Sequence, residues 1–301
     1  MTYTDFMSQT LAEASALAKK YFGNVTSSIK PEDSNQVLTE ADIAIGSQIV
    51  TAIEKQFPGH NIIDEEAGVI DKKSSFTWVV DPIDGTSNFA TGLPTYGVMI
   101  GLLENDIPIA GGLALPAFDE IYLGGKGTPT TKNGKLVQVS QETDLKNSLL
   151  AYGIDGHPEA PEKTEAETTL LKKIILGIRN LRTTNSAYDM AKTIEGKYGL
   201  SLNQTTKIWD NVALHALVEA ASGICTAFWG KPINYKDALI RSQENFTICA
   251  GSPLLHKQIQ AIITSWKNLL LLSLLRAPAH ECFRLILAHT KAFWKLLVNL
   301  F

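Results

Sequence analysis

The feature that most constrains this chain is a short apolar run that leads directly into a turn carrying two carboxylates. Residues 76–80 read Phe-Thr-Trp-Val-Val, a β-branched and aromatic run that is typical of a buried strand. The next residues are rich in turn formers and read Asp81-Pro82-Ile83-Asp84-Gly85-Thr86. Because Pro82 pushes the preceding residue toward an extended conformation, we expect Asp81 at the end of the strand. Asp81 and Asp84, close together on one tight turn, can therefore point at a common centre.

Two carboxylates this close repel each other, and the repulsion indicates what lies between them. At about 4 Å and an effective dielectric near 20, the unscreened cost is about 4 kcal/mol, which a proton or a cation has to offset. No histidine or cysteine is near this turn in the sequence, and all-oxygen ligation favours Mg²⁺ over Zn²⁺. An isolated Asp-Pro-x-Asp-Gly segment is also an ordinary turn. This motif alone leaves a metal role and a purely structural role both open.

Other carboxylates stand out by position, and each has a structural alternative. The acidic run Asp64-Glu65-Glu66 can be solvated charge in a loop. Asp210 stands at the start of an apolar helical segment, where it can be an N-cap. Asp42 completes the capping-box pattern Thr39-Glu40-Ala41-Asp42. Taken singly, none of them predicts a catalytic site.

The order of helices and strands predicts an α+β protein built in layers. Strands cluster in the first half, which looks antiparallel, and Asn133-Gly134 predicts a hairpin turn. In the second half, strands alternate with helices. We expect two parts, 1–145 and 146–264, with the seam in 141–147. The predicted helices are 5–22, 39–57, 164–177, 186–195, 209–221 and 254–263, and the predicted strands are 76–80, 97–103, 110–115, 120–123, 136–139, 148–152, 224–228 and 246–250.

Charge and cysteine content exclude several classes of protein. A net charge of −4, from 27 basic and 31 acidic side chains, argues against a protein that coats nucleic acid. Three cysteines without a CxxC pair predict neither a zinc site nor a disulfide framework, and they suit a reducing compartment. The first residues lack a signal-peptide pattern, and no apolar run reaches the roughly 18 residues of a membrane span. We therefore expect a cytoplasmic protein with no direct nucleic-acid or membrane contact.

Composition changes near residue 265. Residues 265–301 are rich in leucine and carry five Lys or Arg against one Glu, whereas the preceding part carries 22 basic and 30 acidic side chains. We interpret 265–301 as an appended basic tail of unknown role that lies outside the main fold. Pro278 should end a first helix there and permit a second from about His280. An amphipathic hairpin on a membrane or partner surface is the functional alternative for this tail.

Taken together, the motifs are far more specific than any one of them. In order and spacing they resemble those of the inositol monophosphatase family, over roughly residues 5–264. This resemblance implies a layered αβαβα sandwich of the sugar-phosphatase type. It also implies Mg²⁺-dependent, lithium-sensitive hydrolysis of phosphate monoesters. The motifs are Leu38-Thr39-Glu40-Ala41-Asp42, Glu65-Glu66, Trp-Val-Val-Asp-Pro-Ile-Asp-Gly-Thr-Ser-Asn-Phe at 78–89, and Trp209-Asp210 with Glu219 and Gly223 downstream.

The resemblance also implies roles for individual residues. Thr86, paired with Asp42, is expected to orient and deprotonate the attacking water, with Glu66 as a further catalytic residue. The implied ligands of two or three Mg²⁺ ions are Glu65, Asp81, Asp84, Asp210 and the carbonyl of Ile83. The implied contacts to phosphate and substrate are Gly85, Thr86, Ser87, Ala187 and Asn203.

Departures from the family pattern concern the substrate. Asn203 stands where inositol-specific members carry a glutamate, so the charge-assisted part of a contact to substrate hydroxyls is lost. Asn185-Ser186-Ala187 replaces a glycine-led turn that borders the substrate. We expect a small phosphorylated polyol or sugar as substrate, with inositol 1-phosphate first. Histidinol phosphate, fructose 1,6-bisphosphate and adenosine 3′,5′-bisphosphate are the alternatives.

The resemblance extends to partners. Members of the family are commonly homodimers, so we expect a homodimer here. Bacterial relatives include an extragenic suppressor protein that acts in transcription antitermination by binding transcription factors. A regulatory binding role is therefore an alternative to catalysis, and the two roles are compatible.

Overall fold

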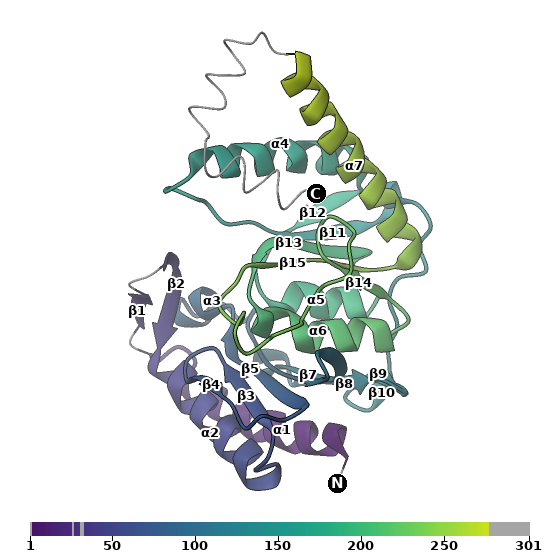
Figure 1. Ribbon diagram of the computed structural model, residues 1–301. Helices are drawn as coiled ribbons and strands as arrows, with labels where there is room; N and C mark the ends of the chain where they lie inside the picture. Colours follow the sequence, from purple (N-terminus) through teal and green to yellow (C-terminus); the bar gives the residue numbers. More distant parts are fainter. Residues whose placement is uncertain (1, 26, 31–32, 277–301) are drawn as a thin grey trace.

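The computed structural model describes residues 2–25, 27–30 and 33–276, and its helices and strands stack in five layers (Figure 1). Helices and sheets alternate from the N-terminal helices to the helices at the opposite end. The predicted α+β class and the αβαβα arrangement are thereby confirmed. Within the described ranges, no helix combines the length and the apolar character that crossing a membrane requires.

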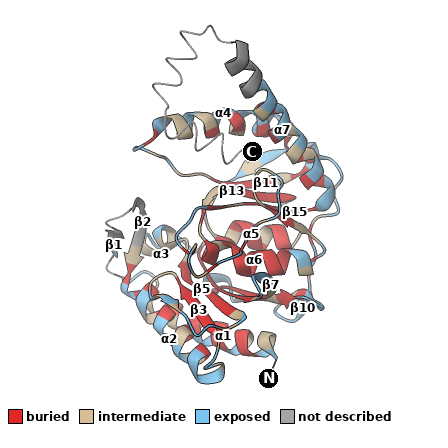
Figure 2. Ribbon diagram, viewed as in Figure 1, coloured by how far each residue is buried: buried red, intermediate tan, exposed pale blue. Residues whose placement is uncertain are grey.

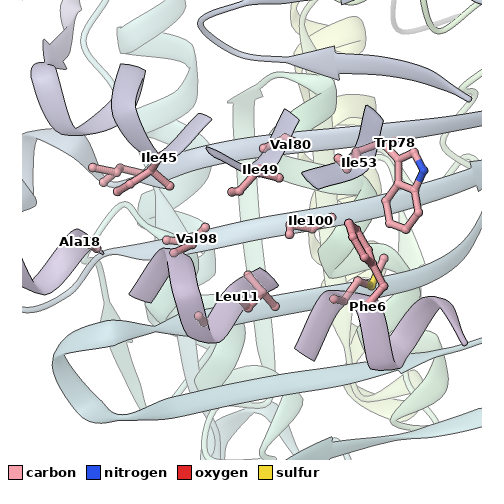
Figure 3. Close-up of a cluster of buried hydrophobic side chains, with 14 of the residues drawn as sticks. Phe6, Leu11, Ala18, Ile45, Ile49, Ile53, Trp78, Val80, Val98 and Ile100 are labelled. Atoms are coloured by element: carbon pink, nitrogen blue, oxygen red, sulfur yellow. The ribbon is translucent and has the colours of Figure 1, made fainter. Parts of the chain in front are cut away.

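The first layer consists of α1 (Tyr3–Tyr21) and α2 (Glu40–Gln56), which cover one face of the larger sheet. Each helix begins with a capping box, in which the N-cap threonine and an aspartate three residues later satisfy each other's backbone N–H groups. Their apolar faces bury side chains against the sheet in the cluster of Figure 3. This cluster includes Phe6, Leu11, Ile45, Ile49 and Trp78, and burial of such side chains is the main stabilising term.

The second layer is an eight-stranded sheet with the order β10-β9-β8-β7-β6-β5-β3-β4. Its pairs are antiparallel except for β3 with β5, which confirms the antiparallel character expected for this half. The strands are β3 (Asn61–Asp64), β4 (Gly68–Ile70), β5 (Phe76–Asp84), β6 (Gly97–Glu104), β7 (Ile107–Leu115), β8 (Glu120–Gly125), β9 (Thr128–Lys132) and β10 (Lys135–Leu136).

The middle layer is formed by α5 (Ala187–Ile194) and α6 (Ile208–Ala220), which lie between the two sheets (Figure 1). Almost every residue of α6 is buried, as Figure 2 shows for the centre of the molecule. The close approach of α6 to the sheet requires Gly111, because a Cβ atom there would lie 2.2 Å from the carbonyl oxygen of Ala213. This contact fixes the position of the helix that carries Asp210.

The fourth and fifth layers are a five-stranded sheet and the two helices α4 (Pro161–Gly177) and α7 (Pro253–Arg276). The helices pack together on the far face of this sheet, where Leu170, Ile174 and Ile263 belong to its core. A two-stranded hairpin of β1 (Ser27–Lys30) and β2 (Asp33–Thr39) precedes α2. The five strands, in sheet order, are β12 (Asn180–Arg182), β11 (Leu149–Gly153), β13 (Leu200–Thr206), β15 (Phe246–Gly251) and β14 (Ile224–Thr226).

All six predicted helices are present, but the last one is longer than predicted. The closing helix does not end near residue 263, because α7 continues to Arg276. Trp266 is 7% exposed, belongs to the core of the second sheet, and stacks on Trp229 with ring centroids 6.3 Å apart. The change in composition at residue 265 therefore does not coincide with the end of a structural element. The predicted domain boundaries at residues 145 and 264 stay predictions, and the second of them falls inside α7. Pro278 and the second helix predicted for the tail lie outside the described residues.

Several strands were not predicted, and one was misplaced. The turn at Asn133-Gly134 is confirmed, with positive φ at both residues, but the strands it joins are β9 and the two-residue β10, so 136–139 is largely wrong. The prediction missed β13, the central strand of the second sheet. Its sequence, Leu-Ser-Leu-Asn-Gln-Thr-Thr, mixes few apolar residues with polar ones, and its pairing with β11 and β15 places it at the centre.

Candidate active site

The strand does not end at Asp81 as predicted, because β5 continues through the expected turn to Asp84 and carries both carboxylates. In the pairing of β5 with β6, Asp81 lies opposite Met99 and Asp84 opposite Gly97, so β5 contains one extra residue at this point. Such a bulge is the expected place for Pro82, which has no N–H group for the ladder. The bulge changes the alternation of side chains and lets both carboxylates approach the same space.

Asp210 reaches these two carboxylates from the first turn of α6. Its Oδ2 atom accepts a hydrogen bond from the backbone N–H of Lys207 at 2.6 Å, so it lies inside the helix rather than at the N-cap. Ligand atoms of Asp81, Asp84 and Asp210 all lie within 4.8 Å of one another. We call these three residues the carboxylate cluster.

Burial and mutual repulsion disfavour ionisation of the carboxylate cluster. Burial, followed by the charge of Glu65, raises the pKa of Asp81 well above its usual value. Burial also raises the pKa of Asp84 and of Asp210 to about 7. Asp81 is 1% exposed, and its Oδ1 atom has no hydrogen-bond partner among the described residues. The charge of Lys207 lowers the pKa of Asp210 but does not outweigh burial, so the cluster is only partly compensated.

Glu65 and Glu66 follow β3 on a turn that Asp64 holds in place. The Oδ1 atom of Asp64 accepts hydrogen bonds from the backbone N–H groups of Glu66 at 2.9 Å and of Ala67 at 2.7 Å. Glu65 lies close enough to the carboxylate cluster to raise the pKa of Asp81 and Asp84. The charge of Glu66 helps to raise the pKa of Asp42.

Thr86 and Asp42 meet beside the bulge. The Thr86 hydroxyl lies 2.8 Å from the carbonyl oxygen of Ile83 and 3.2 Å from Oδ1 of Asp42. The other oxygen of Asp42, Oδ2, accepts hydrogen bonds from the backbone N–H and the hydroxyl of Thr39 at 2.8 and 2.5 Å. Burial raises the pKa of Asp42 to about 6, although these hydrogen bonds oppose the shift. The capping role and the contact with Thr86 therefore use different oxygens of one side chain.

Gly85 connects the bulge to α3 (Thr86–Ala90). Its φ of +82° is in the left-handed region, and a Cβ atom would lie 2.8 Å from Cβ of Ser186. A side chain at residue 85 would therefore be strained and would collide with the neighbouring loop. The backbone N–H groups at the start of α3 have no acceptor within the helix, and Gly85, Thr86 and Ser87 line one cavity.

A cavity of about 570 Å³ lies over the carboxylate cluster, and a smaller one of about 160 Å³ adjoins it. The larger cavity is lined by Glu65, Asp81, Ile83, Asp84, Gly85, Thr86, Ser87 and Asp210, together with residues that the sequence did not single out, such as Asp155 and Lys207. Ala187 and Asn203 line the smaller cavity. The backbone N–H of Ala187 is occupied, because it donates to the Asp84 carboxylate. The structure thus gathers residues that lie up to 168 positions apart, from Asp42 to Asp210, around one site.

The residues present fit a hard divalent cation. The carboxylate cluster, Glu65 and the carbonyl of Ile83 offer oxygen atoms alone, which is the donor set that Mg²⁺ prefers. A cation would also give the Oδ1 atom of Asp81 the partner it lacks and would cancel the repulsion that raises the three pKa values.

Comparison with known proteins points in one direction. The model of the inositol monophosphatase family matches residues 2–267. A protein from Aquifex aeolicus named fructose-1,6-bisphosphatase/inositol-1-monophosphatase is 28% identical over 257 residues, which cover 82% of this chain and 91% of that protein. The probable inositol 1-monophosphatase ImpA of Mycobacterium tuberculosis is 31% identical over 247 residues, 81% of this chain and 87% of that protein. The Nus factor SuhB of Haemophilus influenzae is 30% identical over 200 residues, 64% of this chain and 73% of that protein.

Solved structures agree with this assignment. The structure of an IMPase from Thermotoga maritima superposes with a TM-score of 0.77 at 25% identity, covering 89% of this chain and 99% of that chain. The layered fold, the family match and the buried acidic site are mutually consistent. The chain therefore belongs to the inositol monophosphatase family of metal-dependent phosphatases.

Proposed function

We propose that this enzyme hydrolyses the phosphate monoester of a small polyol with the help of Mg²⁺, and that inositol 1-phosphate is the first substrate to test. The observation that carries the proposal is the carboxylate cluster beside a cavity, where burial and then the neighbouring carboxylate charges raise the pKa values of Asp84 and Asp210. A site that gathers three carboxylates with only partial compensation from Lys207 suits a bound cation and an anionic substrate.

The proposed ligands of two or three Mg²⁺ ions are Glu65, Asp81, Asp84, Asp210 and the Ile83 carbonyl. When bound, Mg²⁺ supplies Lewis-acid stabilisation for the attacking and the leaving oxygen of the phosphate ester. Gly85, Thr86 and Ser87 present backbone N–H groups from the start of α3, which suits the phosphate oxygens. Ala187 acts indirectly, because its N–H holds the Asp84 carboxylate in position.

Thr86 and Asp42 are the proposed acceptors of the proton from the attacking water. The single proton of the Thr86 hydroxyl can go to Ile83 or to Asp42, so the hydroxyl can accept from water while it donates to Asp42. The pKa of Asp42, raised to about 6 by burial, makes it a suitable base near neutral pH. Glu66 is proposed to assist through its charge, which favours the protonated form of Asp42.

The test is release of inorganic phosphate from a panel of phosphate esters with Mg²⁺ and with EDTA. We expect turnover with Mg²⁺, none with EDTA, and inhibition by Li⁺. Thr86→Ala and Asp42→Asn should each lower kcat at least tenfold with little change in KM, and the double variant should be no worse than additive. Full activity in EDTA would contradict the proposal. A normal kcat for Asp42→Asn would leave Asp42 with its capping role alone.

A regulatory binding role is the second candidate, because a relative covering 64% of this chain is named a Nus factor. The catalytically impaired variant Asp84→Asn separates the two roles. A transcription factor that is retained by both the wild-type protein and Asp84→Asn would support a binding role independent of catalysis. The expected homodimer and the cytoplasmic location stay predictions, and the first is measured by light scattering of the eluted protein.

A further inference from the structure

The wall of the site opposite the metal-binding side carries an acidic residue with no assigned role. Asp155 lies two residues beyond the end of β11 and lines both cavities. It is half-buried, and its Oδ1 atom accepts a hydrogen bond from Nδ2 of Asn185 at 2.9 Å. Asn185 itself has φ of +52°, a left-handed conformation that asparagine tolerates better than most residues. Asp155 is thus held at a defined place in the site.

Gly153 allows two amide side chains to stand beside Asp155. A Cβ atom on Gly153 would lie 2.4 Å from Nδ2 of Asn203 and 2.6 Å from Oδ1 of Asn185. The Oδ1 atom of Asn203 accepts from the backbone N–H of Thr205 at 2.7 Å, so Asn203 directs its NH₂ group toward this wall. Asp155, Asn185 and Asn203 therefore form one polar wall, which carries a carboxylate acceptor and amide groups that can form hydrogen bonds with hydroxyl groups.

The charges around this wall discriminate between substrates. Among the described residues that line the two cavities, Lys207 and His157 are the side chains that can be positively charged. Lys207 donates its Nζ to the carbonyl oxygen of Gln243 at 2.6 Å, and His157 lies 3.3 Å from Glu159. A second phosphate group at this wall would meet the carboxylates of Asp155 and Glu159, whereas a neutral hydroxyl would meet acceptors. Carboxylates therefore favour a polyol here and oppose a bisphosphate.

We propose that Asp155 is the specificity-determining residue of this phosphatase, accepting a hydroxyl of the polyol and excluding substrates with a second phosphate group. The proposal rests on the phosphatase function proposed above. It assigns to Asp155 the charge-assisted hydrogen bond to the substrate that Asn203, a neutral amide, cannot make. Asp155 follows the end of β11, whereas Asn203 lies within the neighbouring strand β13, so the two side chains come from adjacent strands.

The experiment compares Asp155→Asn with the wild-type protein on three esters. These are inositol 1-phosphate, fructose 1,6-bisphosphate and p-nitrophenyl phosphate, whose leaving group carries no hydroxyl for the wall. We expect kcat/KM to fall about tenfold to 100-fold for inositol 1-phosphate, because a charged acceptor is lost. The rate on p-nitrophenyl phosphate should stay unchanged, and the ratio of bisphosphate to monophosphate turnover should rise at least tenfold. The Mg²⁺ concentration at half-maximal rate should not move.

Glu165→Gln is the matched control, since it removes one carboxylate from an exposed position on α4. It should leave all three rates unchanged. Equal losses on all three esters for Asp155→Asn, or an unchanged ratio, would overturn the proposal. If the wild-type protein hydrolyses none of the esters with Mg²⁺, the proposed function fails instead. In that case the binding of inositol 1-phosphate, measured by calorimetry, tests the role of Asp155. We expect binding about tenfold weaker for Asp155→Asn than for the wild type, and equal binding would overturn the proposal.

Discussion

Two groups of buried charges in this enzyme differ in one respect, which is charge balance. The carboxylate cluster has three acidic side chains, and among the described residues the charge of Lys207 offsets them only in part, at Asp210. On the other side of α5, Glu120 and Glu195 are joined to Lys132 and Lys192 by four contacts of 2.8 to 3.1 Å. We call these four residues the four-charge network. Two acids and two bases make it neutral, whereas the cluster is not.

The pKa values move in opposite directions in the two groups. Burial opposes ionisation of Glu195, but hydrogen bonds from Lys132 and Lys192 lower its pKa to about 2. Burial raises the pKa of Asp84 and Asp210 to about 7. Burial opposes ionisation in both groups, so burial alone does not determine the charge state. The neighbouring charges decide it.

The difference indicates which group is structural and which is functional. The four-charge network satisfies itself and ties α5 to β8 and β9, while the hydroxyl of Tyr122 donates to Glu120 at 2.7 Å. The carboxylate cluster has no comparable balance of charge, and we propose that a bound cation supplies it. Since α5 starts at Ala187, whose N–H holds Asp84, the balanced group supports the helix that orients the unbalanced one. The carboxylate cluster is thus the group that we propose for catalysis, and the four-charge network is the group that stabilises the fold.

The largest effect should come from neutralising a member of the carboxylate cluster. Asp84→Asn and Asp210→Asn should each reduce phosphate release at least roughly 100-fold, because each removes a proposed cation ligand. The metal-free variants should unfold at the same or a higher denaturant concentration than the metal-free wild type, because repulsion is relieved. Asp106→Asn, on an exposed turn, is the matched control and should behave as wild type. A normal rate of phosphate release for Asp84→Asn would show that the carboxylate cluster is not needed for catalysis.

Substitution in the four-charge network should instead lower stability and leave activity nearly unchanged. Glu195→Gln should lower the free energy of unfolding by about 2 kcal/mol, because two partly buried lysines lose one of their two carboxylates but keep Glu120. Activity per folded molecule should change little. Chemical denaturation and initial rates on the same preparation measure both quantities. A large loss of activity at unchanged stability would show that the network takes part in the reaction.

The stability of the metal-free protein should depend on pH, and the titration of the carboxylate cluster should set the direction of that dependence. Asp84 and Asp210 titrate near 7 when folded and near 3.8 when unfolded, so the folded protein binds more protons between these values. The melting temperature should therefore fall as the pH rises from about 4 to about 7, and Mg²⁺ should restore it most at the upper end. For Glu195, with a folded pKa of about 2, the contribution is present above about 4.5 and is lost only toward pH 2. A metal-free melting temperature that rises across this range would contradict the assignment.

The smallest effect should come from an exposed ion pair of the same chemistry. Lys72 Nζ and Glu54 Oε1 lie 3.3 Å apart, with the two side chains 38% and 45% exposed. Lys72→Met should change the free energy of unfolding by no more than about 0.5 kcal/mol, because solvent screens the pair. Chemical denaturation of Lys72→Met and of Glu195→Gln under the same conditions measures how much burial adds to the contribution of an ion pair to the free energy of unfolding. Equal losses in the two variants would mean that burial is not what distinguishes the network.

Local patterns predicted much of this fold, and pairings between distant segments explain most of the misses. The capping box at Thr39 and Asp42 was readable from four consecutive residues, and the structure contains it. The contact of Asp42 with Thr86 bridges 44 positions and has no local signature. In the same way β13 was missed because its central place depends on β11 and β15, and Asp155 was missed because a single aspartate in a loop forms no pattern.

The sequence by itself predicted the strand that carries Asp81, the turn at Gly85 and the capped helix after Thr39, because each depends on a few neighbouring residues. The extension of that strand to Asp84 through a bulge was not predicted. The resemblance carried by these motifs was sufficient for the family. Only the tertiary structure decided which carboxylates share one space. Packing of α6 against Gly111 carries Asp210 to the bulge, and no short stretch of sequence encodes that approach. Packing also places Trp266 in the core, where composition alone indicated the start of a separate tail.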